Sequence, residues 1–402
     1  MFDAFKIKDF RVYWLGMLVS FTGSWVQTVA QSWLVFDLTG SAWLLGVVAF
    51  LGTAPILVFS LFAGVFADRL NKKNILILTQ TIFMALAFTL AFLVQEKLVT
   101  VQAIMMIAFL NGIVMAFDSP TRQSIVVELV GKRHLLNAIA LNSAAFNSAR
   151  VLGPALGGIF IASLGMAGCF YINGFSFLAV LAALMVIKLS PYKRAGMKDF
   201  LGDLREGLRF VRNNPGIKVL MLMVGTISVF GLSYVVLLPV LAKDFFGLGP
   251  SGLGMMMSAS GAGALLSAVS LASVGDFRNK EKFLFINAFI FSLGLILFSL
   301  CKVYILSLVL LSLIGYSAVS VTSIINTILQ SSAPDEFRSR VISIFMLTFS
   351  GGMPLGSLFA GWVAQIIGAS QAFLAAGSLC LIFFYLLFAK GSITIINNHQ
   401  RR

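Results

Sequence analysis

The chain has 402 residues, of which 59% are hydrophobic and 11% are charged, and its formal net charge at pH 7 is +14. Soluble domains contain roughly 25% charged residues, so this composition excludes a soluble protein and indicates an integral membrane protein. Apolar runs of about 20 residues recur along the chain, the length that an α-helix needs to cross a bilayer, whereas a β-barrel would show shorter alternating segments.

The predicted elements are twelve transmembrane helices in two sets of six, an all-α membrane fold. We place the first six helices at 12–36, 43–66, 75–95, 99–117, 136–163 and 168–188. We place the second six at 217–241, 252–274, 283–301, 304–331, 339–366 and 372–389. The predicted domains are therefore 1–189 and 217–402, two pseudo-symmetric bundles, the second followed by a short cytoplasmic tail.

The linker at 190–216 contains a predicted amphipathic helix. Leucines and arginines recur there at helical spacing on different faces: Leu201, Leu204, Leu208, Arg205, Arg209 and Arg212. Such a helix lies at the inner membrane surface, held by anionic lipid, or provides a site for a regulatory partner. The first predicted helix has no cleavage site after it, so we expect it to be retained and not to act as a signal peptide.

Basic residues are distributed unevenly between the two sides of the predicted bundle. The side opposite the N-terminus holds Lys97, Lys243 and Lys302, whereas the loops on the N-terminal side carry most of the others. The positive-inside rule therefore places both termini in the cytoplasm of a bacterial inner membrane protein. The basic excess reports this orientation, so we expect no nucleic-acid partner. Three cysteines in apolar settings suggest neither a disulfide nor a metal site.

A charged loop, GVFADRLNKK, joins the second and third helices on the cytoplasmic side, and its small and charged residues are Gly64, Asp68, Arg69, Lys72 and Lys73. The similar segment VGDFRNKEKFL follows the eighth helix, which indicates parallel six-helix repeats. Asp118, at the predicted end of the fourth helix, is expected near Asp68 and Arg122. We interpret the whole set as an inner-gate charge network, or, for Asp118, as solvation of a helix end.

The fifth helix contains the segment NSARVLGPALGG, in which small residues recur every four positions around a proline. Its packing residues are Ala149, Gly153, Pro154, Gly157 and Gly158, and Gly352 and Gly356 repeat the pattern in the eleventh helix. Small residues allow close helix contact and proline permits a bend. We expect the eleventh helix to pack against the charged-loop end of the second.

Arg150 lies near the middle of the fifth helix, roughly 18 Å along the axis from either end, too deep to reach the interface freely. Asn147 shares its helical face. A buried charge needs a cavity or a partner. Arg150 therefore either binds an acceptor-rich substrate or relays a conformational change, or it ties neighbouring carbonyls and amides together.

Other predicted helices carry polar residues that we place along the same central pathway. They are Gln27, Gln31, Asn111, Tyr234, Ser323 and Asn326. Each residue taken alone is as well explained by an interhelical hydrogen bond. No acidic or histidine residue falls at a predicted midplane position, and Asp37, near the outer end of the first helix, is the remaining candidate for a proton carrier.

These segments resemble the major facilitator superfamily. Gly64, Asp68, Arg69, Lys72 and Lys73 match its cytoplasmic loop signature. The segments GSWVQTVAQSWLVFDLTGS, DSPTRQSIVVELV and LNAIALNSAAFNSARVLGPALGG resemble the bacterial branch of enterobactin exporters, macrolide efflux pumps and transmembrane secretion effectors. The glycine-proline segment is similar to the motif of antiporters in this superfamily, which seals the outer side, although ordinary tight packing explains it equally.

The resemblance implies a secondary carrier that exports a small amphipathic molecule of drug or siderophore type by alternating access, coupled to protons, without cofactors and as a monomer. Lysophospholipid or lipid translocation and uptake by symport are the alternatives within transport. The sequence lacks GxxxxGK[ST], which argues against an ATP-driven pump. A membrane enzyme would need paired acids or metal ligands, and a sensor would need a soluble extension, so neither fits the chain.

Overall fold

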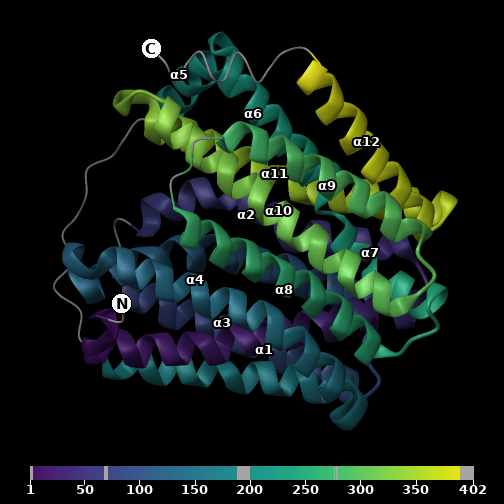
Figure 1. Ribbon diagram of the computed structural model, residues 1–402. Coiled ribbons are helices and arrows are strands. Elements are labelled where there is room, and N and C mark those ends of the chain that lie inside the picture. Colours follow the sequence, from purple (N-terminus) through teal and green to yellow (C-terminus); the bar gives the residue numbers. More distant parts are fainter. Residues whose placement is uncertain (1–2, 68–70, 188–199, 276, 278, 390–402) are drawn as a thin grey trace. The chain divides into compact units, whose positions relative to one another are not determined.

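The computed structural model describes residues 3–67, 71–187, 200–275, 277 and 279–389, and side chains are not described at 60–67, 200, 201, 203, 204, 388 and 389 (Figure 1). The described residues form helices and contain no strand. Nine of the described helices or joined helices are long and apolar enough to span a membrane, with α4 counted once. The predicted all-α membrane architecture is confirmed, and the number twelve stays a prediction.

The chain separates into two compact units. Unit 1 comprises Met1–Gly40, Leu51–Met197 and Gly247–Ser258, and unit 2 comprises Ser41–Phe50, Lys198–Phe246 and Ala259–Arg402. Compared with the predicted domains, the start of α2 joins unit 2 and the start of α8 joins unit 1. These units follow packing, whereas the predicted boundaries follow the repeat, so the boundaries at 189 and 217 stay a prediction.

The helices of unit 1 are η1 (Asp3–Lys6), α1 (Lys8–Thr39), most of α2 (Ala42–Ala67), α3 (Lys72–Gln95) and α4 (Val101–Val186). In Figure 1, α1 (purple) and α3 run beside α4. Asn71 caps α3 because its side chain accepts the Lys73 backbone N–H. Large apolar side chains from these helices form the core, including Phe10, Tyr13, Leu76, Ile125 and Leu184.

The long element α4 is interrupted at two glycines with positive φ, Gly131 (φ 65°) and Gly165 (φ 72°). Only glycine adopts these angles readily, so they divide α4 into three segments, each including one predicted helix from the fourth to the sixth. The first segment continues past the predicted end at residue 117 to Val130. The prediction stopped at the charged residues beginning with Asp118, but these are paired inside the unit, as described below.

After the start of α2, unit 2 continues with the linker helix α5 (Phe200–Asn213) and with α6 (Pro215–Thr226), whose first turn is capped by the Asn214 side chain. The predicted seventh helix is not uniformly α-helical, because two π-helical segments, η2 (Ile227–Gly231) and η3 (Leu241–Phe245), flank α7 (Tyr234–Val240). Such wide turns inside helices are rare and frequently occur at functional sites. They were not predictable from apolar periodicity.

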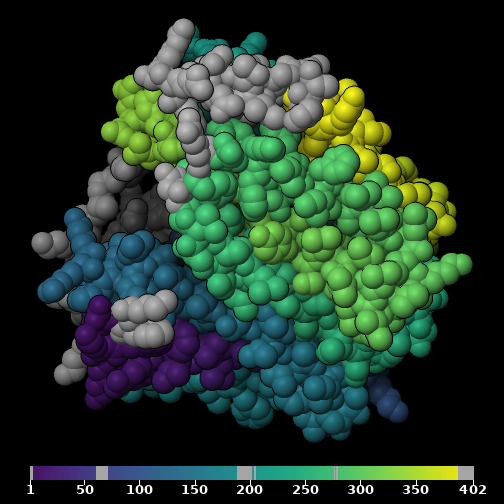
Figure 2. All heavy atoms as spheres, viewed as in Figure 1, coloured from purple at the N-terminus to yellow at the C-terminus, as the bar shows by residue number. Residues whose placement is uncertain are grey.

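The remaining helices are α8 (Pro250–Val274), α9 (Lys280–Leu300), α10 (Tyr304–Ser332), α11 (Asp335–Ile367) and α12 (Ala369–Ala389). Within unit 2, α9 packs against α10 and α12. Helices α9 and α10, which are green in Figure 2, carry exposed apolar side chains: Ile286, Phe289, Leu297, Ile305, Leu306 and Val309. Apolar side chains exposed on a helix of membrane length are expected to face lipid.

Candidate functional site

A carboxylate is fully buried inside unit 1. Asp118 of α4 has no exposed surface, and its Oδ1 accepts hydrogen bonds from Thr79 Oγ1 and Gln80 Nε2 of α3, both at 2.7 Å. Both donors come from consecutive residues of one apolar helix, whose register turns them toward α4. Burying an isolated carboxylate is very costly, so its surroundings must supply compensating charge and donors.

Arg122 supplies the compensating charge. It lies one helical turn after Asp118 on α4, and its Nε forms an ion pair with Asp118 Oδ2. The guanidinium also contacts α1, where Nη1 lies 3.2 Å from Met17 Sδ and Cζ lies 5.5 Å from the centre of the Phe21 ring. Tyr13 lies on the same face of α1 as Met17 and Phe21, one turn before Met17, and it interacts electrostatically with Asp118 and Arg122. We call Asp118, Arg122, Tyr13, Thr79 and Gln80 the Asp118 cluster.

The sequence alone indicated only two members of the Asp118 cluster. Asp118 and Arg122 were predicted to be close, and the structure brings them together within one unit. Thr79, Gln80 and Tyr13 were missed because a lone polar residue in an apolar helix carries no specific signal. The adjacent polar pair in LTQT of α3 was the available clue.

A second ion pair connects the charged loop to α4. Lys72 Nζ pairs with Glu128, and both side chains are largely buried. Lys73 Nζ donates to the carbonyl oxygens of Ile187 at 3.0 Å and Met185 at 3.4 Å, at the C-terminal end of α4, where a cation is favourable. The predicted network members Asp68 and Arg69 lie outside the described residues, and the surroundings of Gly64 are likewise not described. The gating role of this network stays a prediction.

Arg150 is half-buried on α4, and it makes no hydrogen bond or ion pair with another described residue. Its neighbour Asn147 donates to the Ser143 carbonyl of its own helix at 2.8 Å, so it does not bind the guanidinium. The sequence left two interpretations of Arg150: a substrate-binding or conformational role, and a structural role that ties neighbouring carbonyls and amides together. For the structural role, the described residues provide no partner of the guanidinium.

The predicted pathway residues of unit 1 differ in their surroundings. Gln27 of α1 uses Oε1 to accept a hydrogen bond from Asn173 Nδ2 of α4 at 2.7 Å. Gln31 and Asn111 are half-buried. Gln27 therefore serves as an interhelical hydrogen bond in this structure, while the substrate role of all three residues stays a prediction.

The predicted pathway residues of unit 2 are also varied. The Tyr234 hydroxyl is buried and forms a 2.6 Å hydrogen bond with Ser260 Oγ of α8. On α10, Ser323 and Asn326 are half-buried, and Asn326 Oδ1 accepts from Gln330 Nε2 of the same helix at 3.1 Å. Their contact with substrate stays a prediction.

The glycine-proline stripe of α4 is packed on two sides within unit 1. A Cβ at Gly153 would lie 2.4 Å from Trp25 Cβ of α1, and one at Gly157 would lie 3.2 Å from Val29 Cβ. The start of α8 lies against the other edge, where Ser251 Oγ donates to the Gly158 carbonyl at 3.1 Å. Ala149 and Pro154 are buried in the same stripe. The stripe is therefore a close helix seam, and its role as an outer seal stays a prediction.

The small-residue stripe of α11 packs against a helix of unit 2, and its expected contact with the charged-loop end of α2 stays a prediction because the side chains at that end are not described. Side chains at Gly352 and Gly356 would meet Ser228 and Ser233, in and beside η2, at 2.6 and 2.2 Å. Within unit 2, α11 also approaches the start of α2 closely, where Gly361 packs on the Ala42 carbonyl oxygen. That contact lies at the start of α2, at the other end of the helix from the charged loop. Ala42 and Gly46 are small there and allow the close approach.

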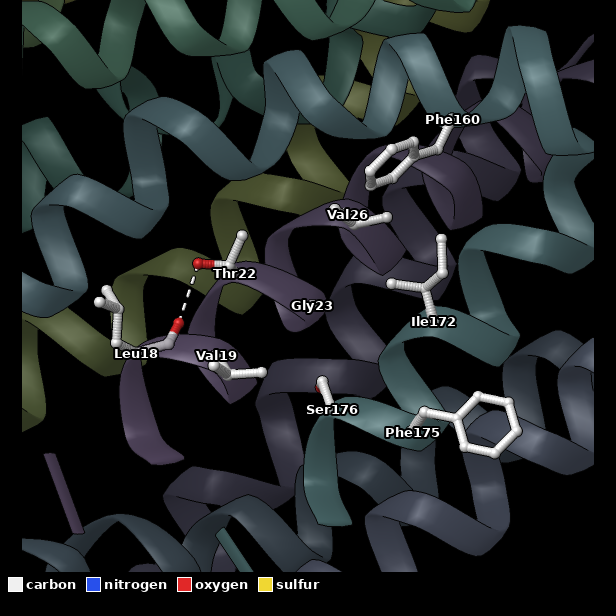
Figure 3. A pocket seen from close by; sticks show the side chains of 9 residues that line it. All are labelled: Leu18, Val19, Thr22, Gly23, Val26, Phe160, Ile172, Phe175 and Ser176. Atoms are coloured by element: carbon white, nitrogen blue, oxygen red, sulfur yellow. Dashed lines mark hydrogen bonds between the residues drawn. The ribbon is translucent and has the colours of Figure 1, made fainter. Parts of the chain in front are cut away.

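Unit 1 also contains an apolar groove of about 490 Å³ between α1 and α4 (Figure 3). Its walls are Leu18, Val19, Thr22, Gly23, Val26, Phe160, Ile172, Phe175 and Ser176. Both hydroxyls are already used, since Thr22 donates to the Leu18 carbonyl at 2.8 Å and Ser176 donates to the Asn173 carbonyl at 2.8 Å. The groove suits hydrocarbon and not a charged group.

Asp37 lies near the end of α1 and is exposed. Water would reach a proton carrier at this position directly, without a path through the protein. The role of Asp37 as a proton carrier stays a prediction. Among the described residues, no group of three or more His, Cys, Asp and Glu side chains is arranged to hold a metal ion.

The sequence profile of the transmembrane secretion effector family matches residues 1–398. The chain belongs to this family. Its members are transporters of the major facilitator type, so the chain is a multi-pass membrane transporter of small molecules and not an enzyme.

Several curated transport proteins are similar to this chain over nearly its whole length. The multidrug efflux pump Tap of Mycolicibacterium fortuitum is 27% identical, covering 89% of this chain and 90% of Tap. Macrolide efflux protein A of Streptococcus pyogenes is 24% identical, covering 94% of this chain and 95% of that protein. The enterobactin exporter EntS of Shigella boydii is 23% identical, covering 94% of this chain and 90% of EntS. The predicted resemblance to this branch is confirmed.

Solved structures confirm the predicted major facilitator fold. A bacterial homologue of the human lysosomal transporter Spinster, in an inward-facing and unoccupied conformation, has a TM-score of 0.75 at 14% identity, covering 96% of this chain and 98% of that one. A D-xylose–proton symporter has a TM-score of 0.73 at 12% identity, covering 94% of this chain and 96% of that one. At these identities the likeness concerns the fold alone.

Proposed function

We propose that this transporter exports a small amphipathic molecule by alternating access, in exchange for protons. The carrying observation is Arg150, a half-buried guanidinium in an apolar helix with no described partner. A charge at such depth is retained when it serves substrate or the conformational cycle. The drug and siderophore efflux named for the relatives supports export of an amphipathic compound.

The buried Asp118 cluster supports proton coupling, because acidic groups held inside the membrane domain of a transporter commonly serve as proton relays. The distribution of basic loops supports a bacterial inner membrane location with both termini in the cytoplasm. In the proposed cycle, the two predicted bundles rock about the substrate, and the charged inner loops pair in the outward-open state. We infer a monomer with no nucleic-acid partner.

The proposal is tested with inverted membrane vesicles that contain the full-length protein. The probes are a macrolide, a catecholate siderophore and a lysophospholipid, each with and without an imposed pH gradient. Accumulation of one probe that rises with the gradient supports proton-coupled export. Accumulation that appears only in right-side-out vesicles contradicts export and supports uptake by symport.

Arg150→Ala is expected to abolish this accumulation while leaving protein abundance near wild type. Arg133→Ala, which removes an exposed arginine of the same element α4, is the matched control and is expected to transport normally. If Arg150→Ala lowers abundance while flux per molecule is unchanged, Arg150 is a structural residue.

Lysophospholipid or lipid translocation is a second candidate, favoured by the apolar groove between α1 and α4. Val19 and Phe175 of this groove are 49% and 59% exposed, so it opens on the surface of the unit. An acyl chain fits such a wall, whereas a siderophore does not. The same vesicle assay tests this candidate, because lysophospholipid would then be the one probe that is moved. Val19→Trp, which adds bulk to the exposed wall of the groove, would reduce that movement.

A further inference from the structure

Four buried polar atoms in the Asp118 cluster have no hydrogen-bond partner among the described residues, and two of them, Asp118 Oδ2 and Arg122 Nε, are ion-paired with each other. The other two are the Tyr13 hydroxyl oxygen and Gln80 Oε1. Native proteins rarely leave such atoms unpaired, and each exception calls for an explanation. Gln80 uses Nε2 to donate to Asp118 Oδ1, so its accepting end is idle in this arrangement.

The neutral partners of Asp118 have a second arrangement available. Thr79 Oγ1 lies 2.7 Å from Asp118 Oδ1 and 3.1 Å from the Leu76 carbonyl oxygen, so its proton can turn toward either oxygen. Half a turn of the Gln80 amide exchanges Nε2 for Oε1 beside Asp118. Both side chains can therefore donate to a carboxylate, and each can accept a hydrogen bond from a carboxylic acid.

Arg122 also has contacts that do not depend on the charge of Asp118. Its guanidinium lies over the Phe21 ring at 5.5 Å and beside Met17 Sδ at 3.2 Å. A cation over an aromatic face is stabilised in a desolvated site. Arg122 therefore keeps a favourable environment if the carboxylate it pairs with is neutralised.

We propose that Asp118 is the group that binds and releases the coupling proton. A proton from water forms an O–H bond with a carboxylate oxygen of Asp118, Thr79 turns its own proton to Leu76, and Gln80 presents Oε1. Arg122 stays charged against Phe21, so the pair changes from neutral to a net charge of plus one. Release to water reverses each movement. The inference rests on the proposed proton coupling and assigns its residue.

The ionisable groups around Asp118 come from each packed element. Tyr13 faces it from α1, and Arg122 faces it from α4 itself. The next acid on α4, Glu128, is ten residues away, about 15 Å along the helix, and is paired with Lys72. On α3, Lys72 is seven residues before Thr79, about 10 Å away. Proton binding in the described cluster is therefore governed mainly by Asp118 and Arg122.

The test measures proton binding directly, without a transport substrate. Infrared difference spectra are recorded on full-length protein in phospholipid nanodiscs as the pH is lowered. The expected result is a new C=O stretch of a buried carboxylic acid in the wild type and in Asp37→Asn, and its absence in Asp118→Asn. Glu281→Gln, which removes another buried carboxyl, in unit 2, is the matched control and should keep the band.

Arg122→Met provides a second variant if Asp118→Asn fails to fold. Without the guanidinium, the acid form should persist to higher pH, corresponding to at least a tenfold (~10×) gain in proton affinity. A wild type without a pH-dependent band overturns the proposal, as does a band that survives in Asp118→Asn or disappears in Asp37→Asn. An unchanged titration in Arg122→Met also overturns it. The absence of gradient-driven flux in vesicles would instead contradict the proposed function, so the two failures are distinguishable.

Discussion

Lys72, the first residue of α3, is ion-paired with Glu128 of α4, so the charged loop is attached to the helix that carries Asp118. The side chains are 15% and 26% exposed, which places the pair between a surface and a buried salt bridge. Its loss leaves a partly desolvated charge without its partner.

We expect Glu128→Gln to lower the free energy of unfolding by about 1 kcal/mol, and the double variant with Lys72→Met to lose less than the sum of the single variants. Thermal unfolding of the purified protein measures this difference. Lys6→Met removes the exposed pair with Asp3 and serves as a control with no expected change. Additive single effects would show that the pair contributes no coupling.

A second prediction concerns the closeness of α4 to α1 at Gly153. An added Cβ there would lie 2.4 Å from Trp25 Cβ, whereas one at Gly52 of α2 would meet nothing nearer than 3.9 Å. Gly153→Ala should therefore destabilise unit 1 by about 1–3 kcal/mol through overpacking. Gly52→Ala should be neutral or stabilising by up to about 1 kcal/mol, because alanine favours helix. Equal melting temperatures for the two variants would refute the close seam.

Helix placement was largely predictable because apolar runs of membrane length leave few alternatives. The same reasoning ended the fourth helix at 117, since Asp118 and Arg122 look like a helix end when their partners are unknown. Thr79 and Gln80 supply those partners from another helix, 39 and 38 residues away in sequence. Single-sequence periodicity contains no information about such pairings.

Packing partners were less predictable than helix positions. The small residues of α4 and α11 correctly indicated close approach, but small size does not specify the neighbour. Gly352 and Gly356 face the π-helical segment η2, a neighbour that their size did not indicate. Neither the π-helix nor the interrupting geometry at Gly131 follows from hydrophobic pattern, because both depend on tertiary contacts.

The N-terminal helix η1 is hydrogen-bonded to a side chain of α4 and packs in the core of unit 1. The Ala4 backbone N–H donates to Asn137 Oδ1 at 2.9 Å, and Ala4 is fully buried. Asn137→Ala should lower the free energy of unfolding by about 1 kcal/mol. It should also increase amide hydrogen exchange at Ala4 and leave exchange in α9 unchanged. Asn213→Ala, at the exposed end of α5, is the control for a general asparagine effect. Unchanged exchange at Ala4 would mean that apolar packing alone holds η1.

The linker helix α5 is attached to α11 by an aromatic stack. Phe210 and Phe337 have ring centres 4.5 Å apart and nearly parallel planes, and Arg340 pairs with Glu206 at 2.7 Å. A 14-residue helix is marginal on its own. The apolar face of α5 is thus at least partly covered by protein, where the sequence alone predicted a helix resting on lipid or on a partner.

Phe210→Ala should therefore increase hydrogen exchange throughout α5, with α9 and α12 unchanged. Leu208→Ala is the matched control, because Leu208 is 50% exposed and lies on a different face of the same helix. If the membrane surface and not α11 holds α5, Leu208→Ala would have the larger effect, and exchange in α5 would slow when anionic lipid is added to the nanodiscs. Exchange measured with and without anionic lipid separates attachment to α11 from attachment to the bilayer, because stacking of two half-buried rings does not depend on lipid charge.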